Sequence, residues 1–381
     1  DFQEVTDLGY VLPGKEGEDW QLSPFGEKAK AFADFALRRH PERGKPYVPF
    51  ALILEHDHGW NAPGWQNNHF VWGNRVPYEQ GDYLIENFFE AAFPGYKVSS
   101  GSYEKNWNPE VPWKSEEEYF EMLHNGYDMR PFNKGKITSS RWGDSFDVLL
   151  ENASLETLKE YPVAILLGRI KLTVDLLGIF KEYVREGGTL VLSSKQLGEE
   201  LSAEEMEDFI GIEVLAPWSE VYGPTTCEIC GRTFEELRFE YTPVRLKGAR
   251  VLATNHRQEP VITEHRVGKG KVIYIAPYYG QELRALSLLK ITTHILDHIY
   301  NEHQLARIEG EPIEYLVNRN EKDLWISLIN NEKSVWEGKV EVKIPSYVNE
   351  GKVKEIWEEK SVHSAREGSS LVFSTSLAPF S

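Results

Sequence analysis

The sequence predicts an α/β protein: a parallel sheet with helices on both faces, followed by a small antiparallel β domain that we expect to be a sandwich. Three observations support this. Continuous apolar runs with the character of buried parallel strands, such as residues 47–56, alternate with amphipathic segments of helical period. Strands that alternate with helices imply βαβ units. After about residue 308 the pattern changes to period two, with turns rich in Asn, Gly and Lys.

The first 45 residues predict one capped helix. Ser23 is the expected N-cap, Pro24 stands at the first helical position, and apolar residues then recur at helical spacing. Gly44 and Pro46 are expected to end the segment. A helix of this kind needs an apolar surface to cover.

The middle of the chain, residues 46–307, carries the α/β pattern. A long polar and aromatic insertion at about 97–143 interrupts it, and long ordered insertions are usually functional. Residues 260–278 read as two strands joined at Gly268–Gly270, which predicts a hairpin. The expected strands are 47–56, 146–154, 162–168, 189–197 and 250–255, and the expected helices are 78–96, 155–161, 171–188, 202–212 and 283–303.

Charge and hydropathy exclude two classes of partner. The net charge of −18 over 381 residues disfavours nucleic acid and anionic membrane surfaces, which both need a basic face. No apolar run approaches the roughly 18 residues of a membrane helix, and no signal peptide is visible. We expect a soluble protein, and the sequence does not distinguish a cytoplasmic from a secreted one. Because it begins with Asp1, we expect a fragment, a processed product or an engineered chain.

The stretch "ALILEHDHGWNAPGW", residues 51–65, is the first candidate site, because ligands of parallel sheets bind beyond the carboxyl ends of strands. One hypothesis is a sugar-binding surface in which aromatic rings stack on pyranose faces and polar groups meet hydroxyls. A second is a metal site of His56, His58 and a carboxylate such as Asp82. A third is a loop whose polar groups satisfy one another. The sugar-binding residues would be Asp57, His58, Trp60, Asn61, Trp65, Trp72 and Tyr78.

Cys227 and Cys230 form the second candidate site. The spacing "CEIC" is one half of a four-cysteine zinc knuckle, and the other half is absent from the sequence. A structural zinc would need His256, His265 or a second chain. The alternatives are a local disulfide or a pair of free thiols in a turn. We therefore expect no cofactor and no firmly assigned metal.

Four stretches resemble the back half of a family 42 type β-galactosidase. "LLGIFKEYVREGGTLVLSS" and "GKGKVIYIAPYYG" resemble the flavodoxin-like "trimerisation" domain of these enzymes, which is itself similar to class I glutamine amidotransferases. "LWISLINN" resembles the core strand of their last domain. "LSPFGEKAKAFADFALRRHPERG" resembles the last helix and exit linker of the catalytic (β/α)8 barrel in relatives of these enzymes.

The resemblance implies three parts: a barrel helix and linker at 1–45, a flavodoxin-like domain at 46–307 and a β domain at 308–381. It implies a role in oligomerisation and in shaping a carbohydrate site, together with a catalytic barrel in the same or another polypeptide. The catalytic carboxylates of such enzymes lie on barrel strands that would precede residue 1, so this chain alone has no recognisable catalytic pair. Glutamine amidotransferase chemistry is not expected either, because neither cysteine lies at a strand–helix elbow. The alternatives are a non-catalytic module that binds glycans or a partner, and an autonomous hydrolase built on Glu55–His58.

Overall fold

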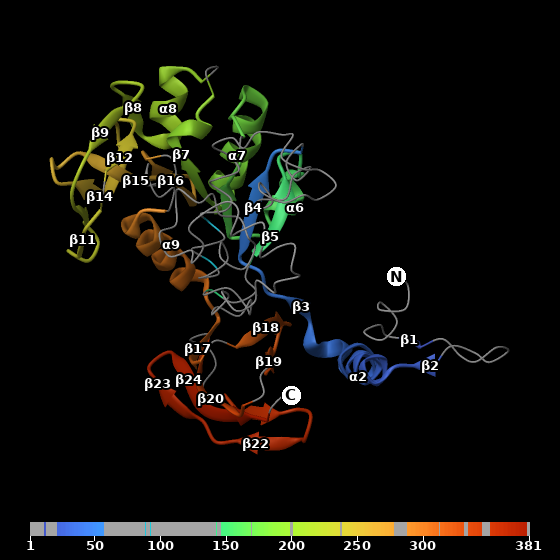
Figure 1. Cartoon of the computed structure of the whole chain (residues 1–381). Coiled ribbons are helices and arrows are strands. Elements are labelled where there is room, and N and C mark those ends of the chain that lie inside the picture. The colour runs from blue at the N-terminus through green and yellow to red at the C-terminus, as the bar shows by residue number, and fades with distance from the viewer. Residues whose placement is uncertain are drawn as a thin grey trace, which may run out of the picture. The chain divides into compact units, whose positions relative to one another are not determined.

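The structure is a computed structural model (Figure 1). The chain divides into two compact units, one formed by Asp1–Tyr47 and Leu316–Leu328 and the other by Val48–Tyr315 and Ile329–Ser381. The described residues are 11–12, 21–56, 88, 92, 142, 146–168, 170–198, 201–236, 238–277, 288–311, 313–330, 334–344 and 351–378.

The smaller unit contains the predicted N-terminal helix. Helix α2, Pro24–Ala33, continues as a π-helix over Asp34–Arg39. The buried Ser23 hydroxyl accepts a hydrogen bond from the Gly26 N–H at 2.9 Å, which confirms the predicted N-cap. The short strands that accompany the helix are β1 (Val11–Leu12), β2 (Gln21–Leu22), β3 (Lys45–Pro46), β18 (Glu314–Arg319) and β19 (Leu324–Ile329).

A sheet of nine strands forms the centre of the larger unit, in the order β11-β10-β14-β15-β16-β7-β6-β4-β5. From β5 to β16 the neighbouring strands pair in parallel, and from β16 to β11 they pair antiparallel. The sheet is therefore mixed, and the prediction of parallel strands applies to one half of it. The parallel strands are β4 (Phe50–Leu54), β5 (Phe146–Leu150), β6 (Val163–Leu166), β7 (Thr189–Ser193) and β16 (Gly270–Ile275).

The five parallel strands lie in an order that is common among doubly wound α/β sheets. Numbered by their succession along the chain, they lie in the order 2-1-3-4-5, which is the order of flavodoxin-like sheets. Every residue of β6 and β7 is buried, as the continuous apolar runs predict for strands covered on both faces. The sequence prediction of a buried parallel strand within residues 47–56 is confirmed by β4.

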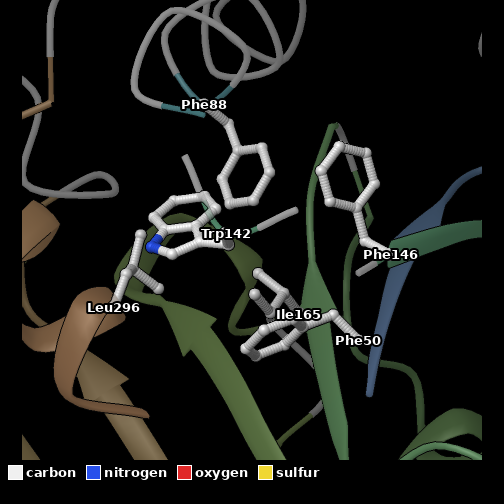
Figure 2. A pocket seen from close by; sticks show the side chains of 6 residues that line it. All are labelled: Phe50, Phe88, Trp142, Phe146, Ile165 and Leu296. Atoms are coloured by element: carbon white, nitrogen blue, oxygen red, sulfur yellow. The ribbon is translucent and has the colours of Figure 1, made fainter. Parts of the chain in front are cut away.

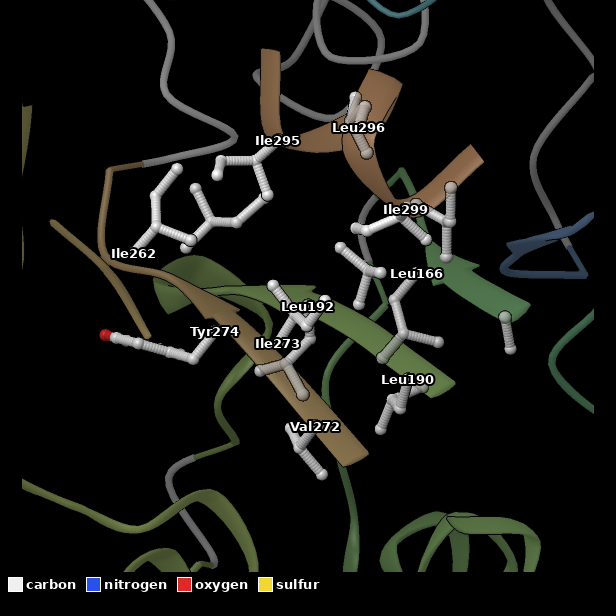
Figure 3. Packing of buried hydrophobic residues seen from close by; sticks show 14 of the residues in the cluster. Leu166, Leu190, Leu192, Ile262, Val272, Ile273, Tyr274, Ile295, Leu296 and Ile299 are labelled. Atoms are coloured by element: carbon white, nitrogen blue, oxygen red, sulfur yellow. The ribbon is translucent and has the colours of Figure 1, made fainter. Parts of the chain in front are cut away.

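Helices pack against this sheet. Helix α7, Val174–Glu186, contacts β7, β15 and β16, and it ends at Gly187 with φ of 128°, as the Gly-Gly pair predicts. Helix α9, Lys290–His303, brings Ile295, Leu296 and Ile299 onto the buried side chains of the sheet (Figure 3). The remaining helices of this layer are α6 (Leu155–Leu158) and α8 (Ala203–Ile210).

The antiparallel half begins with the predicted hairpin. β15, Pro260–Val267, pairs with β16, and Val267 faces Gly270 across the turn, which confirms the turn at Gly268–Gly270. Beyond it the sheet continues through the predicted β14 (Arg250–Asn255) to two short strands that the sequence did not indicate, β10 (Thr225–Cys227) and β11 (Thr233–Phe234). Four further short strands form two separate ribbons, in which β9 (Ser219–Val221) pairs with β12 (Phe239–Tyr241) and β8 (Ile212–Val214) pairs with β13 (Val244–Leu246).

The last part of the larger unit is antiparallel, as the period-two pattern predicts. A four-stranded sheet has the order β17-β20-β24-β23, and a two-stranded ribbon joins β21 to β22. A sandwich arrangement stays a prediction. The strands are β17 (Ala306–Gly310), β20 (Trp336–Lys343), β21 (Val353–Glu355), β22 (Lys360–Val362), β23 (Ala365–Glu367) and β24 (Ser370–Leu377). Among the helices that the structure describes, none has the length and apolar character of a membrane span.

Candidate functional site

The carboxyl ends of the parallel strands bring together polar side chains from two strands and a glycine turn from a third. Glu55 and His56 follow β4, Glu151 follows β5, and Gly168 lies just beyond β6. Parallel neighbours end at the same edge of a sheet, so these positions lie near one another. This edge is therefore the first place where the larger unit can hold a ligand.

The approach of Glu55 to Gly168 depends on glycine. Gly168 has φ of +67°, and a Cβ placed there would lie 2.3 Å from Glu55 Oε2. The carboxylate of Glu55 thus lies against the backbone of the turn after β6. A side chain at position 168 would displace this carboxylate and would also strain the backbone.

His56 and Glu151 form a second contact at this edge. His56 Nδ1 lies 3.2 Å from Glu151 Oε1, and the imidazole is 61% exposed. Carboxylate oxygens accept hydrogen bonds, and the imidazole donates or accepts according to its tautomer. The pair is thus suited to binding hydroxyl groups.

The sequence-predicted sugar-binding residues lie outside the described residues. These are Asp57, His58, Trp60, Asn61, Trp65, Trp72 and Tyr78, and Asp82 of the metal hypothesis lies there as well. Their role stays a prediction. Of the candidate stretch, the structure describes the strand and the first two polar residues, Glu55 and His56, at the edge where the prediction placed them.

A small apolar pocket lies on the same face of the sheet as α9. Figure 2 shows its six lining side chains turned toward one another, from β4, β5, β6, α9 and two further segments. The space measures about 10 Å³, roughly one water, and is far too small for a sugar ring. Trp142 Nε1 donates to Asp297 Oδ1 at 2.8 Å, which anchors the tryptophan to α9. The pocket is therefore part of the core; its lining consists of Phe50, Phe88, Trp142, Phe146, Ile165 and Leu296.

The cysteine pair is completed by a histidine that the sequence analysis missed. Within the described residues, the ligand atoms of Cys227, Cys230 and His294 lie within 4.8 Å of one another. Neither histidine that the sequence analysis considered belongs to this group among the described residues: the His265 ring packs beside Gly211 and Gly248, and the His256 ring lies beside Gly223. No spacing motif could indicate His294, since it comes from α9, 64 residues after Cys230.

The thiols do not lie where a glutamine amidotransferase needs its nucleophile. Cys227 ends strand β10, and Cys230 lies in the turn that leads to β11, so both belong to a hairpin of the antiparallel half. The prediction that neither cysteine occupies a strand–helix elbow is confirmed.

Comparison with known proteins gives a likeness to glycoside hydrolases. No family model matches the chain, and no curated protein matches its sequence. Among solved structures, a β-galactosidase from Bacillus circulans sp. alkalophilus is 11% identical with a TM-score of 0.49, and 93% of this chain covers 43% of that one. A catalytic mutant of a family 42 β-galactosidase from G. stearothermophilus is 14% identical with a TM-score of 0.48, over 93% and 42% of the two chains.

The likeness extends to a different glycosidase. An α-L-fucosidase from Paenibacillus thiaminolyticus is 11% identical with a TM-score of 0.44, over 92% of this chain and 49% of that one. This chain therefore spans less than half of the length of these enzymes.

Proposed function

We propose that this chain is the non-barrel part of a glycoside hydrolase resembling the family 42 β-galactosidases. In this proposal it joins subunits and shapes the rim of a carbohydrate site, while a catalytic barrel, in the same or another polypeptide, supplies the two carboxylates that cleave the glycosidic bond. The proposed parts are a barrel helix and linker at 1–45, a flavodoxin-like domain at 46–307 and a β domain at 308–381.

The observation that carries the proposal is the order of the parallel strands. The order 2-1-3-4-5 is the one that a flavodoxin-like middle domain would have. The stretches that resemble family 42 enzymes also coincide with regular elements. Residues 176–194 run from α7 through Gly187 and Gly188 into β7, and residues 268–280 contain β16. Residues 22–44 contain α2 and the π-helix, as a terminal barrel helix with its linker would.

An exposed aromatic side chain on α2 supports the proposal that this helix packs against a further part of the enzyme. The side chain of Phe32 is 53% exposed, although the helix is amphipathic and capped. In this proposal, Phe32 is a side chain that the barrel would cover. An independent module would be expected to have a closed surface at this helix.

The proposed carbohydrate contacts extend from the carboxyl edge of the sheet. Glu55, His56 and Glu151 supply hydrogen-bonding groups at this edge, and the residues that directly follow are rich in Trp and Asn. We therefore keep Asp57, His58, Trp60, Asn61, Trp65, Trp72 and Tyr78 as the proposed sugar-binding set.

A second candidate function is a non-catalytic module that binds glycans or a partner protein. The side chains of Trp218 and Tyr222 are 60% and 57% exposed at the two ends of β9. The Arg238 guanidinium lies 5.7 Å from the centre of the Tyr222 ring, which holds the ring in place. Exposed aromatic rings beside a strand are typical of a recognition surface.

The first test of the proposal is the intact mass and the subunit composition of the natural protein that contains this sequence. The proposal expects a barrel before Asp1 or in a co-purifying chain, an oligomer by sedimentation, and hydrolysis of a chromogenic β-glycoside. A natural polypeptide that begins near Asp1, purifies alone as a monomer and hydrolyses no glycoside would contradict it and favour the binding module.

The proposed sugar contacts are tested on the same complete protein. Replacing Trp60 or Trp65 by Ala should raise KM about fivefold, because an aromatic stacking contact is worth ~1 kcal/mol. Trp357→Ala is the matched control, since this tryptophan is 61% exposed and lies at the ribbon of β21 and β22. If the control and the two variants change KM equally, the loop is not the sugar-binding surface.

A further inference from the structure

We propose that Cys227, Cys230 and His294 bind a zinc ion that joins the β10–β11 hairpin to helix α9. The three ligand atoms lie within 4.8 Å of one another, and they come from two elements that are distant in sequence. This site is separate from the proposed carbohydrate edge, so the inference stands without the proposed function.

The turn between β10 and β11 presents both thiols on one side. The Gly231 N–H donates to the Cys227 carbonyl at 2.8 Å, and the Cys227 N–H donates to the Arg232 carbonyl at 2.8 Å. Gly231 has φ of +68°, which glycine adopts without strain. The sequence Cys-Glu-Ile-Cys-Gly thus forms the tight turn in which cysteines spaced by two residues ligate a single metal.

His294 supplies the third ligand at a suitable distance. Its Nε2 lies 3.4 Å from Cys230 Sγ. The two ligands of a tetrahedral zinc with ordinary Zn–S and Zn–N bonds would lie about 3.6 Å apart.

The donor set selects zinc over other common ions. Two thiolates and one imidazole are soft or borderline ligands that suit Zn²⁺ and do not suit Mg²⁺ or Ca²⁺. Three protein ligands leave the fourth tetrahedral place for a further ligand such as water. Two thiolates would balance the charge of Zn²⁺. The site would then have no net charge and would not repel the neighbouring Arg232 guanidinium.

The environment suggests a structural role. The ring of Phe234, on β11, lies 5.0 Å from the His294 ring, centre to centre, and Arg232 lies over the same phenyl ring at 5.3 Å. Cys227 is buried while Cys230 is exposed, so one side of the site is packed and the other is open to metal entry. A zinc here would join the outermost hairpin of the nine-stranded sheet to the last helix of the layer (Figure 1).

The test measures zinc in the purified full chain after loading under reducing conditions and removal of free metal. We expect about one zinc per chain by elemental analysis. Replacing zinc by cobalt should give the visible absorption of a tetrahedral ion and a thiolate charge-transfer band. Cys230→Ser and His294→Gln should each weaken binding at least tenfold, since each removes one of three ligands.

His298→Ala is the matched control. This histidine lies one helical turn further along α9, is 44% exposed, and faces Glu302 rather than the thiols. It should leave the stoichiometry and the cobalt spectrum unchanged. Circular dichroism of each variant establishes that it is folded.

Two results would overturn the proposal. One is a chain that binds no zinc although its thiols are reduced; a mass two hydrogens lower without reductant would then assign the pair to a disulfide. The other is a folded His294→Gln variant that keeps full zinc affinity and an unchanged cobalt spectrum.

Discussion

The two halves of the nine-stranded sheet are stabilised in different ways. In the parallel half, β6 and β7 consist of buried, mostly aliphatic residues, and α9 packs its own aliphatic residues onto them (Figure 3). At the antiparallel end, β10 and β11 are short and carry a pair of threonines, the half-buried Thr226 and the exposed Thr233, whose hydroxyls lie 3.2 Å apart.

Polar contacts hold the antiparallel end of the sheet to helix α9. The buried carboxylate of Glu236 accepts from the N–H groups of Ile291 at 3.0 Å and Lys290 at 3.3 Å, and from the Thr225 hydroxyl at 3.3 Å. It therefore caps α9 and ties this helix to β10. The proposed zinc would act between the same two elements. The comparison teaches that apolar burial dominates in the parallel half, whereas specific polar contacts attach the outermost hairpin of the antiparallel half to α9.

The largest expected effect is in the parallel half. Leu166 in β6 is fully buried, so Leu166→Ala should lower the free energy of unfolding by about 2–5 kcal/mol, through lost burial and a cavity. Thr233→Ala at the antiparallel end should cost less than about 0.5 kcal/mol, because this side chain is exposed. Denaturant unfolding of both variants measures the two losses of unfolding free energy. Equal losses would contradict the comparison.

The next effect concerns the carboxylate that caps α9. Glu236→Gln can place an amide NH₂ group against the N–H groups that the carboxylate now accepts from. It should lower the free energy of unfolding by about 1–3 kcal/mol. Glu240→Gln is the control, since Glu240 belongs to the β12–β9 ribbon and is not part of this cap. If Glu236→Gln destabilises no more than its control, then the carboxylate does not support the antiparallel end.

Glu236 also predicts a pH dependence. Burial raises the pKa of this carboxyl above its ordinary value of 4.5, so the folded chain holds this proton more tightly than the unfolded chain. The resulting stability is complete below pH 4.5 and is lost as the pH rises through the folded pKa. The difference in unfolding free energy between the wild type and Glu236→Gln should therefore shrink as the pH rises through this window. A difference that grows would contradict the assigned direction.

The smallest pair of effects concerns two glycines of the parallel half. Gly168→Ala should cost about 1–2 kcal/mol, because of its positive φ and the clash with Glu55 Oε2. Gly178, inside α7, has no atom within 4 Å of an added Cβ, so Gly178→Ala should stabilise the chain by about 0.5–1 kcal/mol. Thermal unfolding of the two variants checks whether the changes in unfolding free energy have opposite signs. If Gly168→Ala leaves the stability unchanged, Glu55 does not lie in close contact with Gly168.

Much of the parallel half could be predicted from the sequence, because its residues carry their own signals. The apolar run of β4, the Gly-Gly end of α7 and the turn at Gly268–Gly270 are local patterns that fold as they indicate. Ser23 likewise begins its helix as predicted. In these places local preference and tertiary packing favour the same structure.

The antiparallel end could not be predicted in the same way. Strands such as β10 and β11 have two or three residues, too few for periodicity, and only their partner strands define them. Helix α9 was expected from residue 283 but begins at Lys290, where Glu236 from a distant segment caps it. His294 was missed as a ligand for the same reason, since contact between distant segments leaves no spacing motif.

Hydrogen exchange of the intact chain, with zinc and after chelation, tests the contrast between the two halves most directly. We predict that amides of β6 and β7 exchange at the same slow rate in both states, as expected for a core that opens only globally. Amides of residues 225–234 and the first turn of α9 should lose protection on chelation, and His294→Gln should show the same loss with zinc present. Unchanged protection at this hairpin in both cases would contradict the account, because the hairpin and α9 would then be held together without the metal.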